Sequence, residues 1–163
     1  MPTDATSVLS PCVIAGGMSR HLLVPLDGSD PSWDALDHVV ETEPDATVTV
    51  LHVIDPARAT YGASVGIPTS SEEWFKAEEA AAEELFETVR ERVAGTDIEL
   101  REETAVGQPS RVIVEYPESI EDGPAVDAIV IGSHGRSGVA RVLLGSVAEV
   151  VVRRSPVPVT VVR

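Results

Sequence analysis

The chain has 163 residues, which suits one domain with a sizeable core and leaves no room for two full domains. Its apolar fraction of 43% with only 4% aromatic residues predicts a core of Val, Ile, Leu and Ala, as in parallel-sheet α/β domains. The 27 acidic residues against 12 basic ones give a net charge of −15, which disfavours nucleic acid and anionic membranes as partners.

The acidic residues are spread over the whole chain among regularly spaced apolar residues, which indicates a folded acidic surface. Lys76 is the only lysine, and this composition resembles that of proteins from salt-loving (halophilic) microbes, where salt screens charge repulsion. The single cysteine, Cys12, excludes an internal disulfide and indicates a reducing, cytoplasmic compartment. No run approaches the roughly 20 apolar residues of a membrane-spanning helix.

The first 18 residues are mildly apolar but lack the basic segment of a signal peptide, and Pro11 interrupts their apolar stretch. We expect residues 1–18 to be either a disordered tail or the product of a misassigned start, with the true start at Met18. One folded domain is expected over residues 19–163.

Residues 21–27 (HLLVPLD) form a short apolar run that predicts the first strand. Asp30 is expected to cap a helix whose first position is Pro31, where the missing N–H of proline does no harm. The apolar residues of this helix recur at helical spacing and are Trp33, Leu36 and Val40. A second apolar run, residues 47–55, predicts the next strand.

A polar loop, residues 55–69, follows, and Ser70 with Glu73 forms a capping box for a long helix. Gly95 lies where the C-terminal cap of that helix belongs. Its buried stripe is predicted to consist of Phe75, Ala82, Leu85, Phe86, Val89 and Val93.

The third strand, residues 97–105, carries five charged side chains, which is typical of an edge strand. A helix from Pro109 is expected to end early at Pro117. Residues 125–132 then predict a buried strand, and a helix over residues 147–154 and a last strand (PVPVTVV) complete the pattern.

Strands that alternate with helices predict a single-domain, Rossmann-like, three-layer α/β sandwich. We expect a five-stranded parallel sheet in the order 3-2-1-4-5 with about four helices. Ligands of such sheets bind beyond the carboxyl ends of the strands, at the switch point of the strand order. The loops after the first strand, residues 27–30, and after the fourth, residues 132–146, therefore form the candidate site.

The second of these loops is rich in glycine. Gly132 and Gly135 let the backbone approach a ligand, while Gly145 and Ser146 open a helix whose free N–H groups and positive dipole end attract an anion. This combination predicts a cradle for an oligophosphate. A structural alternative stays open, because Ser146 and Glu149 also fit a capping box and the glycines could serve a tight turn alone.

Other familiar motifs are absent. The chain has neither a GxxxxGK(S/T) P-loop nor a GxGxxG after its first strand. Its four histidines lie in different elements without metal-ligand spacing and are His21, His38, His52 and His134.

The pattern G-x2-G-x9-G-(S/T), here Gly132, Gly135, Gly145 and Ser146, resembles the ATP-binding signature of the universal stress protein family. The opening segment HLLVPLDGSDPS, the LHVID of the second strand and the closing RRSPVPVTVVR also resemble that family. The likeness covers about residues 19–163.

The resemblance implies a site for ATP, ADP or AMP, with Mg or Mn bound together with the nucleotide. Asp27 would reach the ribose or the metal ion. The nucleoside would contact Pro25, Leu26, Asp27 and Val53, the ribose and phosphates Ile131, Gly132, His134 and Gly135, and the phosphate tail Gly145, Ser146, Val147 and Ala148. The resemblance also implies a homodimer through the last strand, residues 157–162, with Val157 and Val162 at its ends.

Three functions stay open on the sequence. The first is a regulatory or stress-response module whose bound nucleotide changes contacts with its dimer mate or an unidentified protein partner. The second is a slow ATPase or nucleotide-dependent transferase, for which His134 and Asp27 are the evident candidate bases. The third is a structural dimer without nucleotide.

Overall fold

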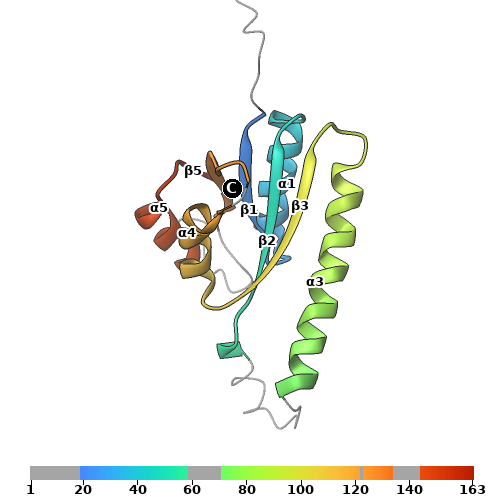
Figure 1. Cartoon of the computed structure of the whole chain (residues 1–163), viewed down its shortest axis with the longest axis vertical. Coiled ribbons are helices and arrows are strands. Elements are labelled where there is room, and N and C mark those ends of the chain that lie inside the picture. The colour runs from blue at the N-terminus through green and yellow to red at the C-terminus, as the bar shows by residue number, and fades with distance from the viewer. Residues whose placement is uncertain (1–18, 59–70, 122, 134–143) are drawn as a thin grey trace, which may run out of the picture.

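The computed structural model describes residues 19–58, 71–121, 123–133 and 144–163. Five strands form one parallel sheet in the order β3-β2-β1-β4-β5, which confirms the predicted α/β class and strand order (Figure 1). The strands are β1 (His21–Pro25), β2 (Thr47–Ile54), β3 (Glu99–Val106), β4 (Ala128–Gly132) and β5 (Val159–Val162). The helices of the described part are α1 (Asp30–Thr42), α3 (Ser71–Val93), α4 (Pro109–Ser119) and α5 (Ser146–Arg154).

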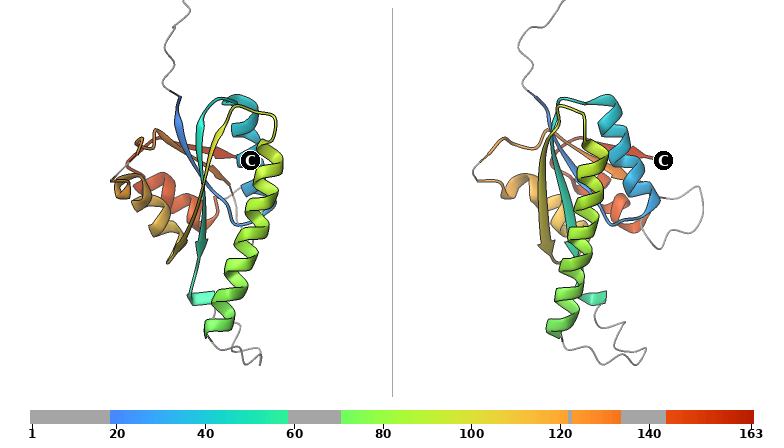
Figure 2. Two further views of the ribbon diagram at one scale, coloured as in Figure 1. Left: turned by 45° about the vertical axis from the view of Figure 1, so that its right-hand side comes forward. Right: turned by 90° about the vertical axis from the view of Figure 1, so that its right-hand side faces the viewer.

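The sheet separates two apolar cores, because successive side chains of a strand point to opposite faces. Leu22 and Val24 of β1 pack with α1 and α3, whereas Leu23 packs with α4 and α5. The two pairs of helices lie on opposite sides of the sheet (Figure 2). Since both faces are covered, β1 and β4 are buried along their whole length, as their continuous apolar sequences predict.

Strand β3 lies at an edge of the sheet, as its charged residues predict. Arg90 of α3 links the helix to this edge. Its Nε and Nη2 donate to the two carboxylate oxygens of Glu102 over 2.8 and 2.6 Å, and its Nη1 donates to Glu83 over 2.9 Å. The bond to Glu102 foremost, and then that to Glu83, raises the pKa of Arg90 above its usual value. Because these pairs are exposed, dissolved salt weakens them.

The long helix α3 has the buried stripe that its sequence predicts. Ala82, Leu85, Phe86 and Val89 are buried against the sheet, and Phe75 and Val93 are half-buried at the two ends of the stripe. Gly95 follows the helix with φ +86°, the left-handed conformation expected of a C-terminal cap. The predicted capping box at the start of this helix pairs Ser70 with Glu73, and Ser70 lies outside the described residues.

Helix α4 corrects one expectation, because it continues through Pro117 to Ser119. Pro117 lies in the last turn, where its missing N–H removes one hydrogen bond and too little helix follows to be disrupted. The hydroxyl of Ser119 donates to the carbonyl of Tyr116 over 2.8 Å and so satisfies an acceptor at the helix end. Among the described helices, none combines the length and the hydropathy needed to cross a bilayer.

A buried histidine fastens the amino end of the sheet, and nothing in its local sequence indicates this role. His21 is 1% exposed, and its Nδ1–H donates to the carbonyl of Pro124 over 2.8 Å, since a carbonyl can only accept. In the neutral ring Nε2 then accepts from the hydroxyl of Thr49 over 2.8 Å. The backbone N–H of His21 donates to Asp127 over 2.8 Å, so that one residue joins β1 to β2 and to the segment before β4.

Strand β4 and helix α1 meet backbone against backbone at Gly132. A Cβ atom at this position would lie 2.3 Å from the carbonyl oxygen of Pro31 and 2.9 Å from the nitrogen of Ser32. Such distances are too short for any side chain, so the first turn of α1 occupies the space beside Gly132. The need for glycine here comes from helix packing, whereas the sequence suggested the approach of a ligand.

We expect Gly132→Ala to lower the free energy of unfolding by about 3 kcal/mol, because the new methyl group must push α1 away from β4. Gly95→Ala is the matched control, since a Cβ at Gly95 meets nothing within 4 Å and only the positive φ is unfavourable. That control should lose about 1 kcal/mol. Urea denaturation measures both, and equal losses in the two variants would contradict the packing contact.

Candidate functional site

The carboxyl edge of the sheet between β1 and β4 is the switch point of this fold. From β1 the chain moves through α1 to β2 and then to β3, and α4 brings it back to β4 on the other side of β1. Leu22 pairs with Ala128 and Leu23 with Ile129, so the ends of β1 and β4 lie side by side. The crevice at such a point is where doubly wound sheets bind their ligands.

The turn after β1 fixes a carboxylate at this edge. Asp27 Oδ1 accepts hydrogen bonds from the backbone N–H of Ser29, over 3.0 Å, and from its hydroxyl, over 2.5 Å. Gly28 between them has φ +78°, which favours glycine. The turn therefore holds the half-exposed Asp27 carboxylate in one place, where it can meet a hydroxyl group or a cation.

The sequence predicted Asp30 as the cap of α1 and Pro31 as its first residue, and both are displaced by one position in the structure. The helix begins at Asp30, with Ser29 in the N-cap position and without a side-chain cap, because the Ser29 hydroxyl is bound to Asp27. The carbonyl of Ser29 accepts from the N–H groups of Ser32 and Trp33 over 3.0 and 3.1 Å. Pro31 therefore occupies the second helical position.

His52 of β2 forms a hydrogen bond that holds the turn after β1, and the sequence did not indicate this role. Its ring is 7% exposed, and Nδ1–H donates to the carbonyl of Leu26 over 2.8 Å. The N–H of Leu26 donates to the carbonyl of Leu51 over 2.9 Å. Both polar groups of the residue before Asp27 are thus bound to β2, which fixes the direction in which the turn leaves the sheet.

The two ends of the glycine-rich segment meet at the end of β4. The N–H of Ser133 donates to the carbonyl of Val162 over 2.8 Å, and the N–H of Gly145 donates to the carbonyl of Ser133 over 2.7 Å. The start of α5 is therefore tied directly to the end of β4. His134 and Gly135 lie outside the described residues.

Helix α5 presents uncapped N–H groups at this junction. Gly145 is the N-cap residue and has no side chain that could cap the helix, so Ser146 is not the cap that the capping-box interpretation requires. Glu149 forms an ion pair with Arg153 over 3.1 Å and does not reach back to the helix start. The first intrahelical hydrogen bond runs from the N–H of Glu149 to the carbonyl of Gly145 over 2.9 Å. The N–H groups of residues 146–148 precede it and form the positive end of the helix dipole.

The apolar residues of the predicted site lie around the same edge, and most of their side chains belong to the two cores. Leu26, Ile131 and Ala148 are at most 6% exposed, which leaves mainly their backbone to a ligand. Val53 and Val147 are half-buried on the face covered by α4 and α5. Strand order thus brings Pro25 to Asp27 beside Ile131 and Gly132, with Val53 on the neighbouring strand β2.

Among the described residues of the predicted site, Asp27 is the one with an ionisable side chain. In the described part, no group of three or more His, Cys, Asp or Glu side chains could hold a metal ion alone. A cation at Asp27 would therefore need ligands besides the described side chains. Elsewhere, burial first and the charge of Glu103 second raise the pKa of Tyr116, and the guanidinium of Arg101 lowers the pKa of Glu99.

Comparison with known proteins gives consistent matches over nearly the whole chain. The model of the universal stress protein family matches residues 18–163. Universal stress protein MJ0531 of Methanocaldococcus jannaschii is 32% identical over 149 residues, which cover 88% of this chain and 82% of that protein. Universal stress protein YxiE of Bacillus subtilis is 34% identical over 152 residues, covering 90% of this chain and 100% of that protein.

Among solved structures, the chain is similar to the hypothetical protein MJ0577, whose biochemical function was assigned from its structure. The TM-score is 0.73 at 30% sequence identity, and the match covers 90% of this chain and 96% of the other.

We expect His52→Leu to lower the free energy of unfolding by about 2 kcal/mol, because the buried carbonyl of Leu26 loses its donor. Amide hydrogen exchange should also become faster at Leu26 and Ser29, since the turn is no longer held by β2. His38→Leu is the control, because the His38 ring has no hydrogen bond to a described residue, and its effect should stay within about 0.5 kcal/mol. Unchanged exchange at Leu26 in His52→Leu would show that the histidine does not hold the turn.

Proposed function

The chain belongs to the universal stress protein family, and on this premise we propose that it is an ATP-binding regulatory or stress-response module. The bound nucleotide would change the contacts of the chain with its dimer mate or with another protein. The observation that carries the proposal is the junction of Ser133 with Gly145, which puts the start of α5 beside the ends of β1 and β4.

The junction supports phosphate binding through the backbone. The N–H groups of Ser146, Val147 and Ala148 and the dipole of α5 would bind the phosphate tail, and the exposed Ser146 could add its hydroxyl. His134 and Gly135 remain part of the proposal through the sequence pattern alone.

The turn after β1 and the neighbouring strands support a nucleoside position. Val53 is half-buried and offers an apolar surface to a base, while Pro25 and Ile131 border the same edge. Asp27 is held by Ser29 and could accept a hydrogen bond from a ribose hydroxyl or bind a cation.

The net charge of −15 opposes a polyanion at long range. Affinity for ATP must then come from local N–H donors and from a divalent cation that offsets the phosphate charge. We propose that Mg or Mn, bound by Asp27 and phosphate oxygens, completes the site. ADP and AMP, with fewer phosphates, would use fewer of these contacts.

We expect Gly145→Val to weaken ATP binding at least tenfold while AMP binding changes less, because the added side chain intrudes on the phosphate position. Gly145 is better suited to this test than Gly132, since its φ of −62° and ψ of 154° suit any residue and Gly132 supports α1. Calorimetry with ATP, ADP and AMP, with and without Mg, measures the affinities. In Asp27→Asn the dependence on Mg should fall.

The control for these titrations is Val152→Ser, an exposed position on the same helix α5, which should bind like the parent chain. If none of the three nucleotides binds to the folded parent chain, the proposal fails. If Gly145→Val binds ATP as tightly as the parent, the phosphate position is wrong.

We also propose a homodimer that pairs the last strand, residues 157–162, with its copy. Strand β5 lies at an edge, and its apolar residues Val159 and Val161 are only half-buried. The carbonyls of Pro158 and Val162 accept from Ile129 and Ser133 of the β4 side, so Val159 and Val161 must direct their N–H and C=O groups outward. These groups are available to a second copy of the strand.

We expect Val161→Pro to shift the chain from dimer to monomer, because proline removes an outward N–H and leaves the ladder to β4 intact. Val161→Ala keeps this N–H and should stay largely dimeric. Analytical ultracentrifugation measures both, and a monomeric parent chain or a dimeric Val161→Pro would argue against this interface.

A further inference from the structure

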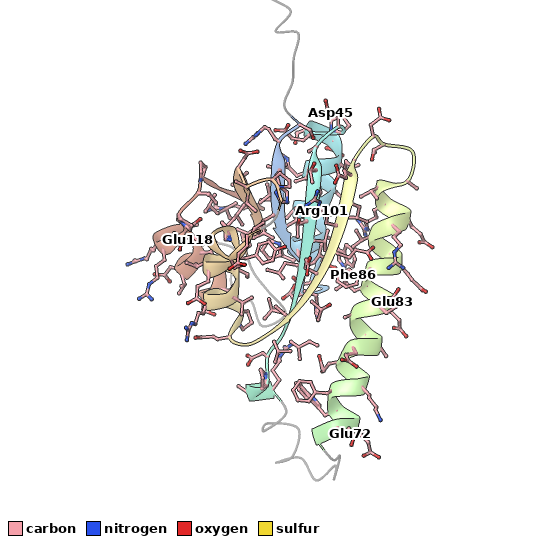
Figure 3. All side chains as sticks on the ribbon, viewed as in Figure 1. Asp45, Glu72, Glu83, Phe86, Arg101 and Glu118 are labelled. Atoms are coloured by element: carbon pink, nitrogen blue, oxygen red, sulfur yellow. The ribbon has the colours of Figure 1, made fainter. Side chains whose placement is uncertain are left out.

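A groove lies between α3 and the ends of β2 and β3, away from the site described above. It has a volume of about 330 Å³, and its apolar wall consists of Ile54, Phe75, Ala82, Phe86 and Val106. Figure 3 labels Phe86 on α3 beside β3, and Figure 1 shows that α3 runs past the ends of the strands here. The volume is at the lower end of the roughly 300–1,000 Å³ of ligand pockets, enough for a few side chains.

The groove and the candidate nucleotide site lie on opposite faces of β2. Ile54 packs toward α3, whereas its neighbour Val53 packs toward α4 and α5. An occupant of the groove therefore does not compete for the nucleoside position.

The wall of the groove includes an apolar residue in an unusual position. Val106 is 56% exposed. In the described part, the other exposed large apolar side chain is Val152, at 45%. Val106 ends the edge strand β3, and Thr104, which also lines the groove, lies on the same face two residues before it.

The backbone at this end of β3 can accept another strand. The N–H of Glu99 donates to the carbonyl of Ala46 and that of Gly107 to the carbonyl of Ile54. The backbone N–H and C=O groups of the odd-numbered residues of β3 therefore point toward β2. Thr104 and Val106 are even-numbered, so their N–H and C=O groups point away from β2, toward the open edge of the sheet. In the described sheet no strand lies beyond β3.

The rim of the groove carries a negative charge that is not compensated by a neighbour. Glu83 is paired with Arg90, and Lys76, the cation one turn before Glu79, is paired with Glu72 over 3.1 Å. Glu79 borders the groove, is exposed and has no ion pair with a described residue. A cation next to an apolar group would complement this rim.

We propose that the groove binds an extended segment of a partner protein that adds to the edge of β3. The segment would place a large apolar side chain against Phe75, Phe86 and Val106, and an Arg or Lys two residues away on the same face near Glu79. Backbone hydrogen bonds to Thr104 and Val106 supply affinity and the groove supplies specificity, as in other strand-addition complexes.

Binding is measured with acetylated, amidated seven-residue peptides that carry Leu and, two residues later, Arg. Matched peptides carry Glu in place of Arg, or N-methyl groups on the edge that would face β3. Trp74 is the reporter, since its ring centre lies 4.9 Å from that of Phe75 in the groove wall. In Trp33→Phe, Trp74 is the only remaining tryptophan, and its emission should change as the Arg peptide binds at low salt.

We expect Glu79→Lys and Val106→Asp each to weaken binding of the Arg-containing peptide at least tenfold. The matched controls, Glu87→Lys on the same helix and Val152→Asp on α5, lie outside the groove and should leave affinity unchanged. The Glu and N-methyl peptides should also bind at least tenfold more weakly. Absence of any emission change, equal binding of the Arg and Glu peptides, or equal losses in the controls would each overturn the proposal.

Discussion

The backbone contact between β4 and α1 at Gly132 decides how the carboxyl edge of the sheet is built. Because the carbonyl of Pro31 fills the space of a side chain there, α1 has to begin directly beside the end of β4. The chain has only residues 26–29 in which to pass from β1 to this fixed point, and the positive φ of Gly28 makes that short turn feasible. The Asp27 carboxylate is consequently placed by helix packing, and such preorganisation would lower the entropy lost by a ligand that bound there.

Features that depend on a short stretch of sequence could be predicted, and features that depend on distant partners could not. Continuous apolar runs were sufficient for β1 and β4, and the spacing of apolar residues for the buried stripe of α3. The partner of His52 is 26 residues away and one partner of His21 is 103 residues away, so no local pattern reveals either hydrogen bond. Gly132 was interpreted as a place where the backbone approaches a ligand, whereas its neighbour in the described structure is the first turn of α1.

Helix starts were misjudged for a related reason. A serine or aspartate near a helix start has several acceptors and donors within reach, and the sequence does not say which it uses. Ser29 binds Asp27, and Glu149 binds Arg153, so neither helix has the side-chain cap that its sequence allows. At the start of α1, Pro31 has no N–H and that of Ser32 is bound to Ser29, whereas α5 has the N–H groups of residues 146–148 before its first intrahelical hydrogen bond. A strongly acidic protein can offer an anion such groups without adding cations to its surface.

The bond between Gly145 and Ser133 also bears on how this protein can be engineered and how it can diverge. It closes a ring of chain whose two described ends are held by the sheet and by α5. The entropy of closing such a ring grows only slowly with its length. We therefore expect changes in the length of residues 134–143 to cost little closure entropy as long as Ser133, Leu144 and Gly145 are kept, because Leu144 packs against the core beside α4 and α5.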